Sequence, residues 1–223
     1  MRGMTIIRRL THEYRQRRFA ILFYSLLLTI GVAPLLHAFG FDLIQGFLAL
    51  NLVAAALGAT GRRGLGMLVL AALFGGARLA GAAFGAQALF TVSEVTWIIV
   101  GFFAAFGALR YALHRGPVNR EHIYAALSVY ILIGLVFGII YILYERIWPG
   151  SFVTISDRAA FSFSRAVYFS FVTLASLGYG DILPVNEAVR GMAILEVVGG
   201  QLYLVVLVAR LVSLYSAQER HQQ

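Results

Sequence analysis

The stretch Phe161-Ser-Phe-Ser-Arg-Ala-Val-Tyr-Phe-Ser-Phe-Val-Thr-Leu-Ala-Ser-Leu-Gly-Tyr-Gly-Asp181 decides how the rest of this chain is read. It begins as an apolar helix pattern, which we place at residues 159–174, and it ends in the motif Ser176-Leu-Gly-Tyr-Gly-Asp. A helix of about 15 residues rises only ~20 Å, which is too short to cross the ~30 Å hydrocarbon core of a bilayer. The sequence therefore predicts a re-entrant helix that enters a membrane without crossing it.

Two glycines alternate with bulky residues in the motif that follows this helix. Gly178 and Gly180 flank Tyr179, and glycine suits a backbone that takes positive φ at intervals while its carbonyls all turn the same way. Irregular backbone at membrane depth is tolerated only where protein buries it or where it lines a watery path. The C-terminal end of the preceding helix would direct its partial negative charge at that path, which favours a cation. The pattern predicts a cation pathway.

The motif resembles the selectivity filter of potassium channels, for which Thr-Val-Gly-Tyr-Gly is the reference sequence. The resemblance is strongest over roughly residues 122–215. It implies an outer helix at 122–145, the pore helix at 159–174, a filter at 176–180 and an inner helix at 187–215.

The same resemblance implies a role for individual residues. K⁺ is the one metal ion that we expect, and its ligands would be the main-chain carbonyls of the filter residues Ser176, Leu177, Gly178, Tyr179 and Gly180. The Ser176 hydroxyl would complete the innermost ion site. Four further residues would support the filter, namely Thr173, Asp181, Tyr168 and Phe169. The chain departs from the family pattern at Ala175, where a second threonine is common, and at Phe169, which lacks the hydrogen-bond donor of tryptophan.

The expected inner helix carries two glycines and a carboxylate at membrane depth. Gly199 and Gly200 stand where the family has a glycine that permits bending, so the resemblance implies a gating hinge; close packing against the fifth helix is the alternative. An intramembrane carboxylate is a functional candidate. We expect Glu196 to be a structural carboxylate that pairs with polar groups behind the filter, so that Glu196→Gln lowers stability.

Composition places the whole chain in a membrane. Its 223 residues are 60% hydrophobic and 13% charged, with a mean hydropathy of +0.82, which is too apolar for a soluble domain of this size. We predict an all-α membrane protein in which a re-entrant pore helix and filter lie between the fifth and sixth of six transmembrane helices. The six apolar spans are 19–38, 42–60, 64–84, 87–112, 122–145 and 187–215. The expected divisions are a basic interfacial segment at 1–18, a four-helix membrane domain at 19–115, a pore domain at 116–217 and a short tail at 218–223.

Arginines predict the orientation and the lipid partner. The 18 basic residues are all arginine, and they cluster at the N-terminus, at Arg62-Arg63 and across 110–120. The positive-inside rule puts these segments and both termini of this multi-pass protein on the cytoplasmic side of the cell membrane. Basic residues at the ends of apolar spans indicate anionic lipid headgroups as partners and argue against nucleic acid.

The expected function follows from these patterns. We expect passive, potassium-selective conduction with K⁺ as the permeant ion, and a homotetramer, because one filter segment cannot surround an ion. The fourth span carries only Arg110, so the voltage dependence should be weak. Two alternatives stay open, a non-selective cation channel and a non-conducting membrane adaptor or subunit that keeps the pore fold. Nothing resembles a hydrolase or redox site, and the chain has no cysteine, so we expect no catalytic residue, no cofactor and no enzyme activity.

Overall fold

The computed structural model describes part of the 223-residue chain, namely residues 17–38, 46–48, 50, 51, 54, 62–114, 119–155 and 161–220. Residues 1–16 of the expected interfacial segment and most of the expected second span lie outside the described residues. The chain divides into two compact units, Met1–Leu132 and Ile133–Gln223. This division falls inside a helix, whereas the sequence analysis placed its domain boundary after residue 115.

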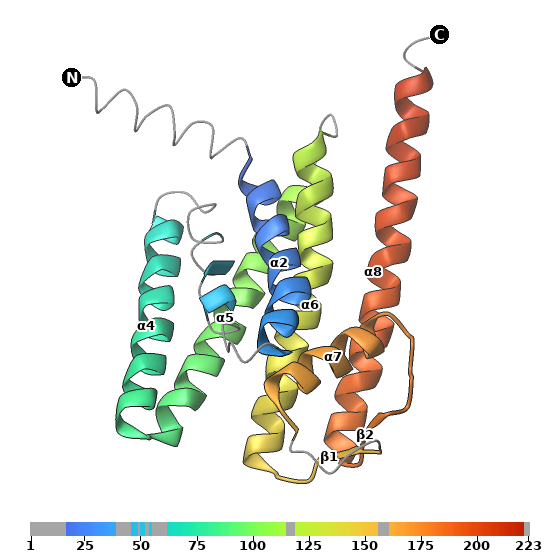
Figure 1. The fold of residues 1–223 in the computed structure, drawn as a ribbon. Coiled ribbons are helices and arrows are strands. Elements are labelled where there is room, and N and C mark those ends of the chain that lie inside the picture. Colours follow the sequence, from blue (N-terminus) through green and yellow to red (C-terminus); the bar gives the residue numbers. More distant parts are fainter. Residues whose placement is uncertain are drawn as a thin grey trace, which may run out of the picture. The chain divides into compact units, whose positions relative to one another are not determined.

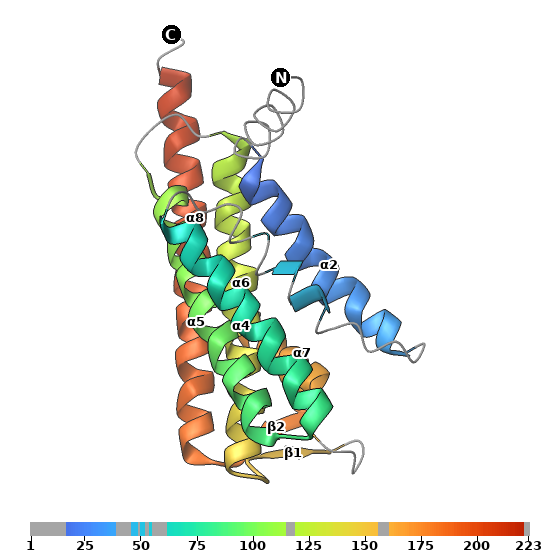
Figure 2. The same ribbon diagram turned by 90° about the vertical axis from the view of Figure 1, so that its left-hand side faces the viewer.

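The first unit contains helices close to three of the expected spans. They are α2 (Arg18–Ala38), α4 (Arg62–Phe84) and α5 (Gln87–Ala112). The helices α4 and α5 lie side by side in both views and are joined at a sharp turn (Figures 1 and 2). Gly85 makes this turn with φ +63, a conformation that glycine adopts without steric cost.

Polar side chains inside the first unit find partners on other helices. The first half of α6 (Arg120–Ile147) supplies Glu121, whose carboxylate accepts a hydrogen bond from the Phe19 backbone N–H of α2 at 2.9 Å. The buried Asn51 side chain donates to the Thr29 hydroxyl at 2.8 Å. These contacts pair the Phe19 N–H and the Asn51 amide N–H, which would be costly to leave unpaired in an apolar interior, whereas Asn51 Oδ1 is buried without a hydrogen-bond partner among the described residues.

The second unit holds the stretch on which the sequence analysis depended. It contains the second half of α6, β1 (Phe152–Thr154), α7 (Phe163–Leu174), β2 (Ile182–Pro184) and α8 (Glu187–Arg220). The strands β1 and β2 pair antiparallel, with Phe152 opposite Pro184 and Thr154 opposite Ile182. They lie beside the C-terminal end of α6 (Figure 2). Since β1 precedes α7 and β2 follows the Ser176–Asp181 motif, this pairing joins the start of the expected pore loop to its end.

Two element boundaries differ by more than two residues from those predicted. The pore helix was expected from residue 159, but α7 begins at Phe163, because Ser162 has extended backbone and its hydroxyl accepts a hydrogen bond from the Arg165 N–H as an N-cap. The inner helix was expected to end at 215, but α8 continues to Arg220, so residues 218–220 of the expected tail are helical. The sequence after Gly200 contains no glycine or proline that would end the helix.

Three helices among the described residues are long and apolar enough to cross a membrane. These are Ala88–Ala112, Arg120–Ile147 and Glu187–Arg210, and they overlap the expected fourth, fifth and sixth spans. Shorter apolar helices occur at Arg18–Val32 and Val69–Gly81. The described part of the chain is thus mostly helical and carries membrane-compatible helices both before and after α7 in the sequence.

Candidate functional site

The backbone of the filter motif alternates between two conformations. Ser176, Gly178 and Gly180 have φ values of 57, 56 and 77, while Leu177 and Tyr179 between them are outside the positive-φ region. In an ordinary extended strand successive carbonyls point to opposite sides, and an alternating sign of φ turns every second peptide so that the carbonyls share one side. The positive φ expected at the two glycines is confirmed. Ser176 was not expected there, because a side chain in that region costs ~1–2 kcal/mol.

The last turn of α7 holds the start of the motif. The Ser176 N–H donates to the Thr173 carbonyl at 2.9 Å, and the Leu177 N–H donates to the Val172 carbonyl at 2.9 Å. Carbonyls at a helix C-terminus lack partners within the helix, and here the first two residues of the motif, Ser176 and Leu177, supply the donors. The helix end thus imposes the tight turn on Ser176, and Thr173 supports it through its backbone.

The C-terminal end of the motif contacts α7 and the residue that follows β1. The Tyr168 hydroxyl lies close enough to the Asp181 carboxylate to interact with it electrostatically, and the Asp181 carbonyl accepts a hydrogen bond from the Ile155 N–H at 2.9 Å. The structure therefore brings together two of the residues expected to support the filter, Tyr168 and Asp181.

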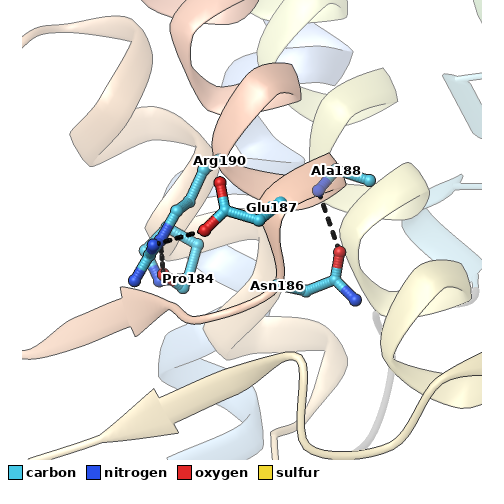
Figure 3. A network of polar contacts seen from close by, with 5 residues as sticks. All are labelled: Pro184, Asn186, Glu187, Ala188 and Arg190. Carbon is cyan, nitrogen blue, oxygen red and sulfur yellow. Dashed lines mark hydrogen bonds and ion pairs between the residues drawn. The ribbon is translucent and has the colours of Figure 1, made fainter.

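The turn from β2 into α8 is fixed by polar contacts (Figure 3). The Arg190 guanidinium donates to the Pro184 carbonyl at 3.0 Å and to the Glu187 carboxylate at 2.8 Å. The Asn186 side chain accepts a hydrogen bond from the Ala188 N–H at 2.9 Å and so caps the helix. The sequence analysis missed this cluster, although an Asn just before an acidic first turn is a recognisable helix start.

An aromatic cluster lies on one side of α7. Phe169 is buried, and its ring centroid lies 5.1 Å from that of Tyr141 and 5.3 Å from that of Phe152, both in edge-on geometry. Such pairs contribute about 0.5–1.5 kcal/mol each beyond their buried area. Phe169 therefore contributes through ring packing, which does not need the hydrogen-bond donor of tryptophan.

Glu196 connects three helices. It is 1% exposed. Its Oε2 accepts a hydrogen bond from the Tyr141 hydroxyl of α6 at 2.6 Å, and its Oε1 lies 2.5 Å from the Ser170 hydroxyl oxygen of α7. The sequence analysis expected polar partners for this carboxyl group without naming them, and Tyr141 and Ser170 are those partners.

The number of protons in this cluster bears on the charge of Glu196. The Ser170 hydroxyl has one proton, yet its oxygen lies 2.6 Å from the Gly134 carbonyl oxygen and 2.5 Å from Glu196 Oε1. Both contacts are hydrogen bonds only when the carboxyl group supplies a second proton, because two bare oxygens at such a distance would repel each other. A buried charge without a counter-ion is also costly. We infer from these distances a neutral, protonated Glu196 that accepts a hydrogen bond from Tyr141 and donates one to Ser170.

Gly200 allows α8 to approach the end of α7. A Cβ atom at this position would lie 2.5 Å from Leu174 Cδ1 and 3.1 Å from the Leu174 carbonyl oxygen, whereas a Cβ on Gly199 would meet nothing within 4 Å. The helix runs unbroken through both glycines. Gly200 is therefore a close-contact glycine, and its neighbour is α7, whereas the alternative in the sequence analysis named the fifth helix. The hinge at Gly199 and Gly200 stays a prediction.

Gln201 follows this contact and reaches the filter motif. Its side-chain Nε2 donates to the Ser176 hydroxyl oxygen at 2.9 Å. The sequence analysis did not select Gln201, although an uncharged polar residue directly after a paired glycine in an apolar helix was a usable signal. Within the described ranges, no group of three or more His, Cys, Asp or Glu side chains is placed to hold a metal ion.

Residues 127–217 match the family model described as ion channel. The match covers most of α6 and the whole segment from β1 to β2, and it reaches nearly to the end of α8. Comparisons with curated proteins and with solved structures give no significant match. The matched domain and the apolar helices indicate ion channel activity in a membrane protein, and this family is generally non-enzymatic.

Proposed function

We propose that this protein is a potassium channel that conducts K⁺ passively through a homotetrameric pore. The observation that carries the proposal is the alternating φ of Ser176, Gly178 and Gly180 within the matched ion channel domain. Carbonyls on one side of a strand can replace the hydration shell of K⁺ when four strands surround the ion. In the proposed pore, the carbonyls from Ser176 to Gly180 form these rings, and Tyr168, Phe169, Thr173 and Asp181 keep them in place.

Exposed apolar side chains support the four-fold assembly. Leu177 and Tyr179 are 55% and 66% exposed in a single chain, although they lie in the motif whose backbone would face the ion. Neighbouring copies of this chain would cover these side chains, and closed symmetry makes each copy equivalent. We therefore include the homotetramer in the proposal.

The remaining membrane arrangement belongs to the same proposal. It has six spans, a re-entrant α7, and both termini in the cytoplasm with anionic lipid at the arginine-rich ends. Gating by bending at Gly199 and Gly200 and a weak voltage dependence are also proposed. The fourth span supports the weak dependence, because its arginine lies at the helix end, where Arg110 is exposed.

Cation flux from liposomes tests the function. Liposomes that contain the purified protein should release K⁺ down its gradient much faster than Na⁺. Gly178→Ala should abolish this flux or remove its selectivity for K⁺, because a Cβ at φ 56 costs ~1–2 kcal/mol in each subunit. Gly191→Ala is the matched control, since Gly191 is helical and a Cβ there meets nothing within 4 Å.

The outcomes separate the proposal from its alternatives. Equal flux of K⁺ and Na⁺ through the unmodified protein would indicate a non-selective cation channel. A stable assembly that carries neither ion would indicate an adaptor or subunit with a retained pore fold. Unchanged selectivity in Gly178→Ala would reject the assignment of the filter.

A further inference from the structure

The inner helix touches the filter motif through one amide. Gln201 Nε2 lies 2.9 Å from Ser176 Oγ and 3.4 Å from the Leu174 carbonyl oxygen. Gly200 makes this reach possible, because any side chain there would collide with Leu174 and push α8 away. The contact joins residues that are 25 positions apart in the chain.

The residue that receives this hydrogen bond is unusual. Among the described residues, Ser176 is the one non-glycine residue with positive φ. Its hydroxyl oxygen has two lone pairs and one proton. The Gln201 N–H occupies one lone pair and directs the positive end of its dipole at the oxygen.

We propose that Gln201 is a positioning residue that limits the cation affinity of the innermost ion site through the Ser176 hydroxyl. The inference rests on the proposed function, in which this hydroxyl lies at the inner end of the filter. With the amide in place, one lone pair is left for the ion. Conduction requires binding that is weak enough for the ion to leave, and the amide weakens the last site before the inner side of the membrane.

A competing explanation gives Gln201 a packing role alone. In that case its removal would loosen the contact between α8 and α7, and cation binding would weaken or stay the same. The proposed role gives the opposite sign, because loss of the N–H frees a lone pair and binding becomes tighter.

Ba²⁺ is a suitable probe because it has nearly the radius of K⁺ and twice its charge. A ligand that binds the folded state raises the melting temperature with its concentration, so the half-saturating Ba²⁺ concentration can be measured on the purified assembly without ion flux. Gln201→Leu should lower this concentration about tenfold, the equivalent of one net hydrogen bond. In the Ser176→Ala background, which lacks the hydroxyl, the same substitution should leave it nearly unchanged.

Two further variants provide a replacement for Gln201→Leu and a control. Gln201→Met keeps an unbranched side chain without a donor and replaces Gln201→Leu if that variant fails to assemble. Leu202→Ala is the control, because adjacent helical residues point about 100° apart, and it should not alter Ba²⁺ binding.

An equal change in both Ser176 backgrounds would overturn the proposal, since Gln201 would then act on the ion directly. No change, or weaker binding, would overturn it in favour of packing. The K⁺ flux assay is scored separately. The expected Ba²⁺ result without K⁺ flux would reject conduction and keep this inference, and selective flux with no effect of Gln201 would do the reverse.

Discussion

Replacing Glu196 by leucine and by glutamine should affect stability very differently. Leucine has similar bulk but cannot accept the hydrogen bond of Tyr141, whose side chain is 0% exposed. A buried donor without an acceptor costs about 1–3 kcal/mol. Ser170 adds little to this cost, because in the leucine variant its proton still has an acceptor in the Gly134 carbonyl, whose oxygen lies 2.6 Å away.

Glutamine should be tolerated because Glu196 is neutral in this cluster. The amide oxygen can accept from Tyr141, and the amide N–H can donate to Ser170 in place of the carboxyl proton. We expect Glu196→Gln to cost less than ~1 kcal/mol per chain. This expectation revises the one drawn from the sequence alone, in which loss of the carboxylate lowered stability.

Thermal unfolding of the detergent-purified protein measures the difference. For a chain of this length, about 2–4 °C corresponds to 1 kcal/mol, so Glu196→Leu should lower the melting temperature by ~2–12 °C. Tyr141→Phe is the matched control, because it removes the donor that leucine would strand. In that background the leucine substitution should cost about 1–3 kcal/mol less. If glutamine destabilised the protein as much as leucine, the proton count would be wrong and Glu196 would be charged.

Three further outcomes follow from other parts of the chain. Gly200→Ala should cost about 1–3 kcal/mol by overpacking against Leu174, whereas Gly199→Ala has open space and should be tolerated; equal unfolding temperatures would reject the close contact. The Glu145 carboxylate accepts hydrogen bonds from the backbone N–H groups of residues 150, 151 and 152 at 2.8, 2.8 and 3.3 Å. Glu145→Gln should therefore speed hydrogen exchange at these three groups, and unaltered exchange would contradict that role. Arg110→Gln should leave the voltage dependence of open probability almost unchanged in bilayer recordings. One whole charge that crosses the membrane field contributes only ~2.3 kcal/mol per 100 mV, and this one lies at a helix end. A large loss in the steepness of open probability against voltage would show a voltage sensor.

Local patterns in the sequence predicted the elements that depend on neighbouring residues. The helices at 64–84 and 87–112 were placed within two residues of α4 and α5, because apolar runs and glycine breaks mark such helices directly. The positive φ of Gly178 and Gly180 was also expected, since glycine is the residue that adopts it without cost.

Contacts between distant residues were beyond the reach of these patterns. Tyr141 and Ser170 lie 55 and 26 positions from Glu196, and no local spacing relates them. The positive φ of Ser176 is imposed by the end of α7 against the preference of serine itself. The start of α7 was placed too early because the apolar pattern continues upstream of the capping Ser162.

The pairing of β1 with β2 makes the segment between them suitable for a reversible disulfide cross-link. Val153 lies opposite Leu183, and both side chains are exposed. Opposed residues of an antiparallel pair have Cα atoms about 4.5–5.5 Å apart, within the range that a disulfide spans. The chain has no cysteine, so Val153→Cys together with Leu183→Cys would introduce its only two thiols. Oxidation would then fasten the base of the loop and reduction would release it, so any movement of the strands during ion conduction could be stopped and restarted in the same sample.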